Sequence, residues 1–283
     1  MKKTSVIIVT YNSKEEIIPC VESVYLNQFE SSDIEIIIID NNSSDGTFEL
    51  LNKLNYHHIK IFRNEDNPGY TRAVNQGIKY STGDYLFLLN PDTVLKDNCI
   101  KLLCEFLESS DEYAAAAPVM YYPDGKLQYS VRNFPDYWNM FCEFSLLAYI
   151  FPRTHLFGSW KAKYIDYTNS QDVQQPMAAA LMIKKTVAAK LGGMDERFRM
   201  FFNDVDLCKR IYDNGFRIRL ISDAAVTHIH GASIKKQRSE MIKIWNSDCI
   251  AYFNKHFGDG FKIRMLALFL KMSGAVRIFF SKT

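Results

Sequence analysis

The chain has 283 residues, of which 47% are hydrophobic and 14% aromatic, enough for one large core or for one core with an appendage. Its 34 basic and 32 acidic residues give a net charge of only +2, which offers no general case for binding nucleic acid, although it permits a local basic patch. The six cysteines are scattered without a C-x-x-C pair, so a reduced, cytoplasmic compartment is the simplest interpretation, and neither a zinc site nor a disulfide framework is supported.

The first residues predict a strand rather than a targeting signal. The apolar run from Val6 to Val9 is too short for the core of a secretory signal peptide. No stretch reaches the roughly 18 apolar residues that a transmembrane helix needs. We therefore expect a cytoplasmic protein.

Strands and helices alternate over the first 115 residues. Apolar runs that predict buried strands are residues 5–9, 34–40, 59–62, 85–90 and 113–120. Helical patterns lie around Val21 and Val24 and over residues 48–54, 71–83 and 99–107. This alternation predicts an α/β fold, a doubly wound, mostly parallel sheet flanked by helices.

Local signals mark the ends of two of these helices. Ser13 and Glu16 have the spacing of a capping box, and Pro19 either kinks the first helix or marks its true first turn. Gly83 is predicted to end the helix that begins near residue 71.

The second half is less regular. Residues 121–175 lose periodicity and are rich in aromatic residues. Regular patterns return as predicted strands at 178–183, 216–221 and 225–230, with helices near 185–193 and from Asp204 to Asp213, the latter capped by Gly215.

The last 45 residues contain a segment, 261–280, in which Lys262, Arg264, Lys271 and Arg277 alternate with large apolar residues. This pattern predicts a C-terminal helix. It suits an amphipathic helix lying in a membrane interface, and it suits equally a helix packed on the protein itself with a solvated basic face.

The turns after the strands lack two common phosphate-binding loops. The first turn, TYNSKEE, has no glycine, and no G-x-x-x-x-G-K-[ST] loop occurs. A diphosphate bound here would need another source of positive charge, such as a metal ion held by a carboxylate. Pro91 ends the strand at 85–90, and Asp92 then lies at the carboxyl edge, where open α/β sheets bind ligands.

Seven segments occur in the order found in the family-two inverting glycosyltransferases of GT-A fold, and the chain resembles in particular their bacterial rhamnosyltransferase-like branch. The segments are SVIIVTYNS, IIIIDNNSSDGT, NPGYTRAVNQGI, GDYLFLLNPDT, GGMDERF, NDVDLCKR and AVTHIHGAS, with a weaker echo in DGKLQYSVRNFP. The resemblance implies a GT-A domain over residues 1–235, with a nucleotide-binding half (1–115) and an acceptor and catalytic half (116–235). A helical tail, 236–283, with possible peripheral membrane contact through 262–280, would follow.

Members of this family transfer a sugar from a nucleotide diphosphate to a hydroxyl and invert the anomeric centre. The resemblance implies a donor site made by Thr10, Tyr11, Asp40, Asn67, Gly69, Asn75, Asn90 and Asp92. Asp40 would accept a hydrogen bond from the N3–H of uracil or thymine. The alternative for Asp40 is a residue that only closes an Asx turn, and for the 67–77 segment it is a plain turn into a helix.

The resemblance also implies a metal site. Asp92 would bind Mn²⁺ or Mg²⁺ against the two phosphates, and His228 would complete the metal shell, with His230 as the rival candidate. An imidazole ligand favours Mn²⁺. Asn90 replaces the first Asp of the usual Asp-x-Asp motif, so it can bind the ribose but adds no charge.

The resemblance assigns the catalytic base to Asp204. A predicted helix start would keep Asp204 ionised, and a purely structural first-turn acid is the alternative. Many relatives carry Glu-Asp where this chain has Asn203-Asp204, which leaves a catalytically impaired protein open. We expect Asp206 to be structural and Asp195-Glu196-Arg197 to organise the preceding loop.

The acceptor site is expected in two places. Ala178–Ala180 are small and would leave room for substrate, and the aromatic segment offers Tyr137, Trp138 and Trp160 for stacking on sugar rings. A loosely packed apolar surface accounts for these aromatic residues equally well.

The interpretation is a metal-dependent, inverting glycosyltransferase at the inner face of the cytoplasmic membrane. It would add a sugar, with L-rhamnose from dTDP-rhamnose as the preferred donor, to a cell-surface glycan or a lipid-linked acceptor. UDP-linked galactofuranose, galactose or N-acetylglucosamine are alternative donors, and an impaired nucleotide-sugar-binding partner subunit is the alternative function. We expect no nucleic-acid partner, and an oligomer is compatible with the sequence.

Overall fold

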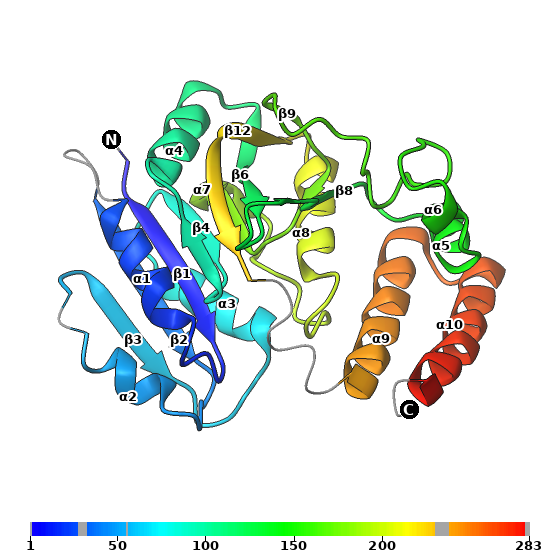
Figure 1. The fold of residues 1–283 in the computed structure, drawn as a ribbon, viewed down its shortest axis with the longest axis horizontal. Helices are drawn as coiled ribbons and strands as arrows, with labels where there is room; N and C mark the ends of the chain where they lie inside the picture. Colours follow the sequence, from blue (N-terminus) through cyan, green and yellow to red (C-terminus); the bar gives the residue numbers. More distant parts are fainter. Residues whose placement is uncertain (1, 28–32, 55, 230–237, 281–283) are drawn as a thin grey trace.

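One twisted sheet organises the chain. The computed structural model describes residues 2–27, 33–54, 56–229 and 238–280, with residues 238 and 275–280 as backbone alone (Figure 1). Within this part of the chain, the main strands are β1 (Thr4–Thr10), β2 (Ile34–Asp40), β3 (Ile59–Arg63), β4 (Tyr85–Leu89), β5 (Thr93–Leu95), β6 (Tyr113–Tyr121), β11 (Ala180–Lys184) and β12 (Arg217–His228). They pair in the order β3-β2-β1-β4-β11-β6-β12-β5.

The strand directions confirm a mostly parallel sheet. β1 runs parallel to β2 and β4, and β12 runs parallel to β6. β11 is inserted between β4 and β6 and runs antiparallel to both. The carboxyl ends of β4 and β6 therefore meet the amino end of β11 at one edge of the sheet.

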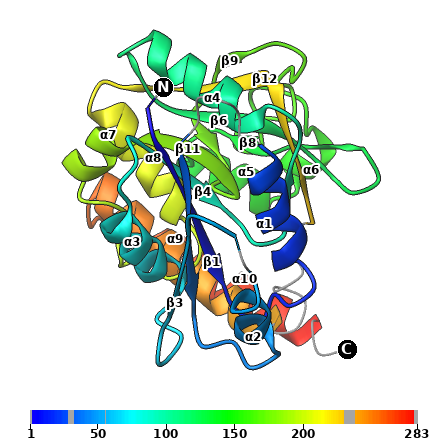
Figure 2. The ribbon, with the colours of Figure 1, turned by 90° about the vertical axis from the view of Figure 1, so that its left-hand side faces the viewer.

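Helices cover both faces of the sheet, as predicted. They are α1 (Ile17–Leu26), α2 (Thr47–Leu51), α3 (Tyr70–Tyr80), α4 (Cys99–Ser109), α7 (Lys185–Lys190) and α8 (Asn203–Asp213). Figure 2 shows α1 on one side of the strands and α3 with α8 on the other. Because successive side chains of a strand point to opposite faces, buried strands such as β1 and β2 supply both layers with apolar residues.

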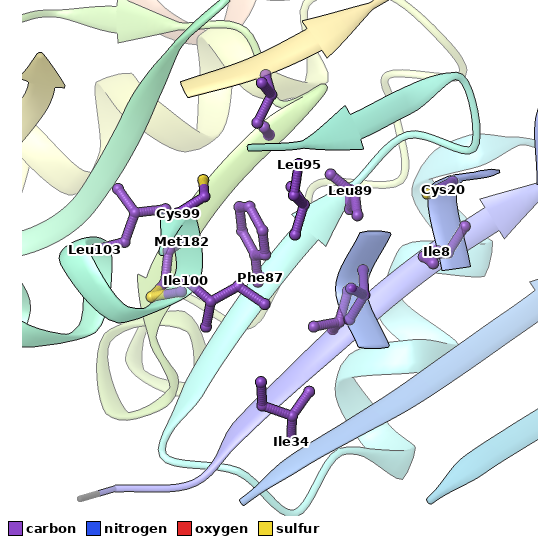
Figure 3. Packing of buried hydrophobic residues seen from close by; sticks show 14 of the residues in the cluster. Ile8, Cys20, Ile34, Phe87, Leu89, Leu95, Cys99, Ile100, Leu103 and Met182 are labelled. Atoms are coloured by element: carbon purple, nitrogen blue, oxygen red, sulfur yellow. The ribbon is translucent and has the colours of Figure 1, made fainter. Parts of the chain in front are cut away.

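The two layers divide the strands' side chains cleanly. Ile8 and Phe87 pack with α1 and α4, whereas Ile7 and Leu88 pack with α3 and α8. Figure 3 shows Phe87 among Met182 of β11 and Ile100 of α4 in the first layer. This alternation fixes the register of each strand, since a slip of one residue would move polar groups into the core.

Two predicted helix signals are wrong. Ser13 and Glu16 form no capping box: α1 begins at Ile17, and no side chain caps it, because the Ser13 hydroxyl donates to the Tyr11 carbonyl. Pro19 lies in the first turn, where its missing N–H costs nothing. Gly83 does not end α3, which stops at Tyr80.

Gly83 is required for another reason. A Cβ at this position would lie 2.6 Å from the Ser5 nitrogen and 2.9 Å from the Lys3 carbonyl oxygen. The residue therefore lets the chain approach the start of β1 before it enters β4.

The predicted strands at 216–221 and 225–230 are one strand, β12, with a register shift between Ile221 and Ala225. Helix α8 ends as predicted, with Gly215 at a φ of 82° just after it.

The aromatic segment is not featureless. It contains α5 (Tyr137–Phe144), α6 (Leu147–Ile150) and the short strands β7 (Leu127–Gln128), β8 (Val131–Arg132), β9 (Gln171–Asp172) and β10 (Gln175–Pro176).

Two long helices, α9 (Arg238–Phe257) and α10 (Phe261–Phe280), follow the sheet. Figure 1 shows them beside α5 and α6, at the end of the molecule away from β3. Ile263, Leu266 and Leu270 are buried in a third apolar cluster with Tyr252 and Trp160. One face of α10 thus packs on the protein. Among the helices that the structure describes, none combines the length and apolar character needed to cross a bilayer.

Candidate active site

The ends of several strands converge on one edge of the sheet. Thr10 and Asp40 end the parallel strands β1 and β2 and are register partners. The Asn90 nitrogen, just past β4, donates to the Ala179 carbonyl at 2.9 Å, immediately before β11. The structure therefore brings together the carboxyl ends of these strands and the alanines that were expected to leave room for an acceptor.

Asp92 and His228 are neighbours at this edge. Oδ1 of Asp92 lies 3.3 Å from Nε2 of His228. The antiparallel pairing of β5 with β12 sets this contact, since His228 is opposite Thr93 and the Ile229 nitrogen donates to the Asp92 carbonyl at 2.9 Å. Two residues that are 136 positions apart in the sequence thus form one pair.

The surroundings of His228 suit a metal ligand. Its Nδ1 lies 2.9 Å from Oε1 of Gln128, and in the tautomer that donates from Nδ1 to this oxygen, Nε2 directs a lone pair toward Asp92. Histidine ligands are commonly oriented in this way through their other ring nitrogen. A lone pair and a carboxylate that face each other suit a cation. Within the described residues no third His, Cys, Asp or Glu joins them, and His230 lies outside the described residues.

Asp40 is fully buried and engaged in a turn. Its Oδ1 accepts from the Ser43 hydroxyl at 2.5 Å and its Oδ2 from the Ser43 nitrogen at 3.0 Å, with Nε of Arg63 3.7 Å from Oδ2. The turn-forming role is thus present, and the predicted contact with a base remains a prediction. Thr10 is also buried, and its hydroxyl has no partner among the described residues, whereas Tyr11 is 48% exposed.

Asn67 lines a surface cavity of about 330 Å³, whereas Gly69 is not among the lining residues. The cavity lies between the 66–72 segment and the loop before α8 and is lined by Asp66, Asn67, Pro68, Thr71, Arg72, Glu196, Phe198 and Arg199. Oδ1 of Asn67 accepts from the Gly69 nitrogen at 3.0 Å, and Gly69 has a φ of 93°. A larger cavity, about 520 Å³, contains none of the residues predicted for the site.

Asn75 has a clear structural task. Its amide donates to the Met194 carbonyl at 2.9 Å and accepts from the Met194 nitrogen at 2.9 Å. Asn75 therefore fastens α3 to the loop before α8, and Gly193 passes so close that a Cβ there would lie 2.6 Å from the Asn75 oxygen. Its predicted contact with the donor stays a prediction.

Asp204 is at the start of α8, as predicted, and faces the amino end of β11. Its Oδ2 accepts from the Gln175 amide at 3.1 Å and the Ala178 nitrogen at 3.4 Å, while Oδ1 accepts from the Val205 nitrogen at 2.8 Å. The N–H groups at the helix start favour the ionised form of this acid, because the hydrogen bond from the Val205 nitrogen lowers its pKa. Burial raises the pKa of Asp204, and these N–H groups and the Arg132 charge offset only part of that effect.

Three residues that the sequence reasoning missed lie at this site. Gln128 orients His228, and Gln175 contacts Asp204. Tyr70, the first residue of α3, is near both acids: burial first, and then the charges of Asp204 and Asp92, raise the pKa of its hydroxyl. For Gln128 the sequence signal was the weak family resemblance of DGKLQYSVRNFP. Gln175 and Tyr70 lie in segments from which other residues, Ala178–Ala180 and Asn75, were chosen as candidates.

Asp206 has the structural role that we expected. It is fully buried, and it accepts from Nε of Arg210 at 2.7 Å and contacts Nε2 of His256 at 2.9 Å. Burial opposes its ionisation, but His256, Lys255 and Arg210 together hold its pKa below the ordinary value.

Comparison with known proteins decides the family. Residues 5–166, more than half of the 283-residue chain, match Glycosyl transferase family 2. The chain belongs to this family.

Several curated proteins resemble this family-two glycosyltransferase. The glycosyltransferase GlyG of Streptococcus pneumoniae serotype 4 is 27% identical over 109 residues, which are 38% of this chain and 36% of GlyG. The N-acetylglucosaminyl-diphospho-decaprenol L-rhamnosyltransferase of Mycobacterium tuberculosis is 23% identical over 206 residues, 69% of this chain and 66% of that protein. This chain thus spans less than two thirds of the length of either relative.

Solved structures confirm the GT-A fold. The mannosyltransferase PcManGT of Pyrobaculum calidifontis, in complex with GDP-Man and Mn²⁺, superposes with a TM-score of 0.62 at 15% identity. The match covers 99% of this chain and 73% of PcManGT. Residues 1–349 of Staphylococcus aureus TarS in complex with UDP superpose with a TM-score of 0.59 at 17% identity. The match covers 89% of this chain and 66% of that TarS chain. This family-two glycosyltransferase therefore has the predicted architecture.

Proposed function

We propose that the protein is a metal-dependent, inverting glycosyltransferase that moves a sugar from a nucleotide diphosphate to a hydroxyl of a cell-surface glycan or lipid-linked acceptor. The observation that carries the proposal is the pair formed by Asp92 and His228, 3.3 Å apart at the edge where Asp204 also lies. L-Rhamnose from dTDP-rhamnose is the favoured donor, because the M. tuberculosis relative is named as a rhamnosyltransferase.

The residues at the edge fit a donor bound through a divalent cation. Asp92 and His228 would hold Mn²⁺ or Mg²⁺ through one carboxylate oxygen and one imidazole nitrogen, with Gln128 fixing the ring. When bound, the cation would neutralise charge on the diphosphate leaving group. Thr10, Tyr11, Asp40, Asn67, Gly69, Asn75 and Asn90 remain the proposed donor-binding residues.

Asp204 is the proposed catalytic base. An acceptor hydroxyl must lose a proton as it attacks, and a carboxylate with a raised pKa is a better proton acceptor than an ordinary aspartate. We place the acceptor hydroxyl beside this carboxylate, where Ala178 and Ala179 have no side chain beyond Cβ.

Asn203 has structural contacts that are compatible with an active enzyme. Its amide donates to the Thr71 hydroxyl at 3.3 Å and the Met200 carbonyl at 3.1 Å. A carboxylate at this position would face that carbonyl oxygen without a proton to donate. The amide therefore suits this loop, and its presence has a structural cause that does not require loss of catalysis.

The test is turnover of a panel of nucleotide sugars with Mn²⁺. The wild-type protein should slowly hydrolyse one donor, with dTDP-rhamnose compared against UDP-linked galactofuranose, galactose and N-acetylglucosamine. Asp204→Asn should lower transfer at least about 100-fold and leave donor binding within about twofold. Normal transfer by this variant would contradict the base assignment, and binding without any turnover would favour the partner-subunit alternative.

The acid limb of the pH profile is a second test. Because the base must be ionised and the folded-state pKa of Asp204 is above the ordinary 3.8, kcat/KM should fall as the pH drops through a value above 3.8. A limb below that value would contradict the assignment.

We further propose that the outer face of α5, α6 and α10 contacts the inner face of the membrane. Apolar side chains are exposed on it, including Tyr149 at 83%, Phe261 at 78% and Met272 at 64%. The α5 and α10 helices adjoin, since the rings of Phe144 and Phe269 are 5.2 Å apart. Exposed Lys262, Arg264 and Lys271 add positive charge, which complements anionic lipid.

Vesicle sedimentation tests this surface. A variant with Phe261, Met265 and Leu268 replaced by Ser should lose binding to anionic vesicles, and added salt should weaken the binding of the wild type. Leu26→Ser, which changes an 80% exposed leucine on α1, is the matched control and should bind normally. Equal binding by the triple variant would dismiss the surface.

A further inference from the structure

Arg132 faces the proposed base. It lies in β8, directly opposite Gln175 of the antiparallel strand β10. Residues directly opposite each other in antiparallel strands carry their side chains on the same face. The Gln175 amide donates to Asp204 at 3.1 Å, so Arg132 and Asp204 lie on the same side of this ribbon.

The Arg132 guanidinium has no anionic partner of its own. It lies over the ring of Trp160, 4.9 Å from the centroid, and within the described residues it makes no hydrogen bond and no ion pair. The nearest acids are engaged elsewhere, because Glu143 pairs with Lys161 and Asp204 accepts from Gln175 and backbone nitrogens. Burial lowers the pKa of Arg132, and the charges of Asp204 and Glu143 oppose this only in part.

Such an arrangement is costly unless an anion completes it. An unpaired, largely buried charge is normally avoided in proteins. Trp160, only 7% exposed, holds the planar fork in place, and a rigid guanidinium is the group that best matches two oxygens of a phosphate.

We propose that Arg132 binds a phosphate group of a substrate next to Asp204. This inference rests on the proposed function, in which two substrates can carry that group. The donor has a diphosphate, and a lipid-linked acceptor has one as well. Both sources present the same chemistry to Arg132, and the experiment separates them.

The binding arm uses inorganic pyrophosphate, UDP and dTDP as probes, titrated by calorimetry in the presence of a chelator so that no metal contributes. Arg132→Met removes the charge and keeps the bulk, and Arg132→Lys keeps the charge. Arg217→Met is the matched control, since Arg217 pairs with Asp172 and Glu112 at the start of β12, far along the strand from His228. Thermal unfolding of each variant checks that it folds.

If Arg132 binds the donor's diphosphate, Arg132→Met should weaken all three probes about 10- to 100-fold, Arg132→Lys should restore part of the loss, and the control should bind as the wild type does. If it binds an acceptor phosphate, nucleotide binding stays normal. Transfer to a long-chain alkyl diphosphate glycoside then falls by the same factor, while transfer to the matched alkyl glycoside without phosphate does not change.

The inference is overturned if Arg132→Met binds every probe normally and treats both acceptors equally, or if its sole effect is a moved acid limb in the pH profile. The second result would mean that Arg132 only adjusts the proton affinity of Asp204. The binding arm needs no turnover. If the wild-type protein transfers no sugar but binds pyrophosphate, and Arg132→Met loses that binding, the proposed function is refuted and the anion site stands.

Discussion

Nε2 of His256, near the end of α9, lies 2.9 Å from Oδ1 of Asp206, two residues after the proposed base in α8. Lys255 reaches the same carboxylate oxygen at 2.5 Å and Oδ2 of Asp195 at 2.7 Å. The C-terminal helices are thus joined to the helix that carries Asp204 by a buried ionic cluster as well as by apolar contacts.

Removal of the Asp206 carboxylate should therefore be costly. Asp206→Ala leaves Lys255 and Arg210 without this shared partner, and breaking a buried ion pair from one side costs about 3–5 kcal/mol. Denaturant unfolding measures the loss. Asp213→Ala, which removes an exposed partner of Lys209 in the same helix, should change stability by less than about 1 kcal/mol. Similar values for both variants would show that the cluster does not hold the helices.

Acid should destabilise the protein through Glu35. Burial by itself would raise the pKa of Glu35, but hydrogen bonds from Ser5, Lys60 and Thr82 outweigh it and lower the pKa from 4.5 to about 2. A lowered folded-state pKa contributes stability above the unfolded value, and this contribution is lost as the pH falls from about 4.5 toward about 2.

Because the Lys60 side chain is 46% exposed and solvent screens its charge, the contribution of Glu35 amounts to about 1–2 kcal/mol near neutral pH. Glu35→Gln should be less stable than the wild type by about that amount at pH 7, and the gap should close as the solution is acidified. Unfolding midpoints at several pH values measure it. Glu22→Gln changes an exposed glutamate and should run parallel to the wild type throughout. A gap that is independent of pH would contradict the assignment.

Gln128 should control metal affinity without being a ligand. Gln128→Leu removes the acceptor that orients the His228 ring, and loss of such a partner typically costs 10- to 100-fold in metal affinity. Titration of transfer against Mn²⁺ concentration measures it. Gln171 lies in β9, which pairs with the first half of β12, whereas His228 ends β12. Gln171→Leu should therefore leave the titration unchanged. An unchanged titration for Gln128→Leu would argue against His228 as a ligand.

The packing of α3 on β1 depends on Gly77. A Cβ at Gly77 would overlap Cγ2 of Ile7, so Gly77→Ala should lose about 1–2 kcal/mol although alanine is the better helix former. Gly260→Ala adds a Cβ that meets nothing within 4 Å and should stay within about 0.5 kcal/mol of the wild type. Thermal unfolding compares the two, and an unaffected Gly77→Ala would mean that α3 can shift freely.

Much of the fold was predictable because strands buried on both faces are unambiguous. The runs that became β1, β2 and β4 are continuous and apolar, and each is followed by a polar turn. The reversal of β11 was not predictable, since a five-residue apolar strand has the same pattern in either direction. The capping-box prediction failed for a similar reason. The spacing of Ser13 and Glu16 cannot show that the Ser13 nitrogen donates to the Thr47 hydroxyl instead of to Glu16.

The meeting of Asp92 and His228 was predictable because each lies in a motif that ends a strand. Asp92 and His228 were identified from segments at strand ends, and their pairing required only that both ends meet at one edge. Arg132 and Gln175 were missed, because short strands leave no periodic signal, and Tyr70 was missed because the start of a helix does not show what its side chain faces. Their roles depend on which residue lies opposite, and that is a property of the folded chain alone.

The reversed strand has a consequence for how such a protein can diversify. The backbone leaves the sheet after β1, β2 and β4 at the edge that carries the proposed donor-binding residues, but it enters the sheet at β11 after the whole excursion from residue 122 to 179. The part of that excursion around α5 and α6 can change its length or its side chains while Ala179 stays hydrogen-bonded to Asn90 and Gln128 stays beside His228. Under the proposed function, a change of acceptor in that part of the chain need not disturb the residues proposed to hold the donor.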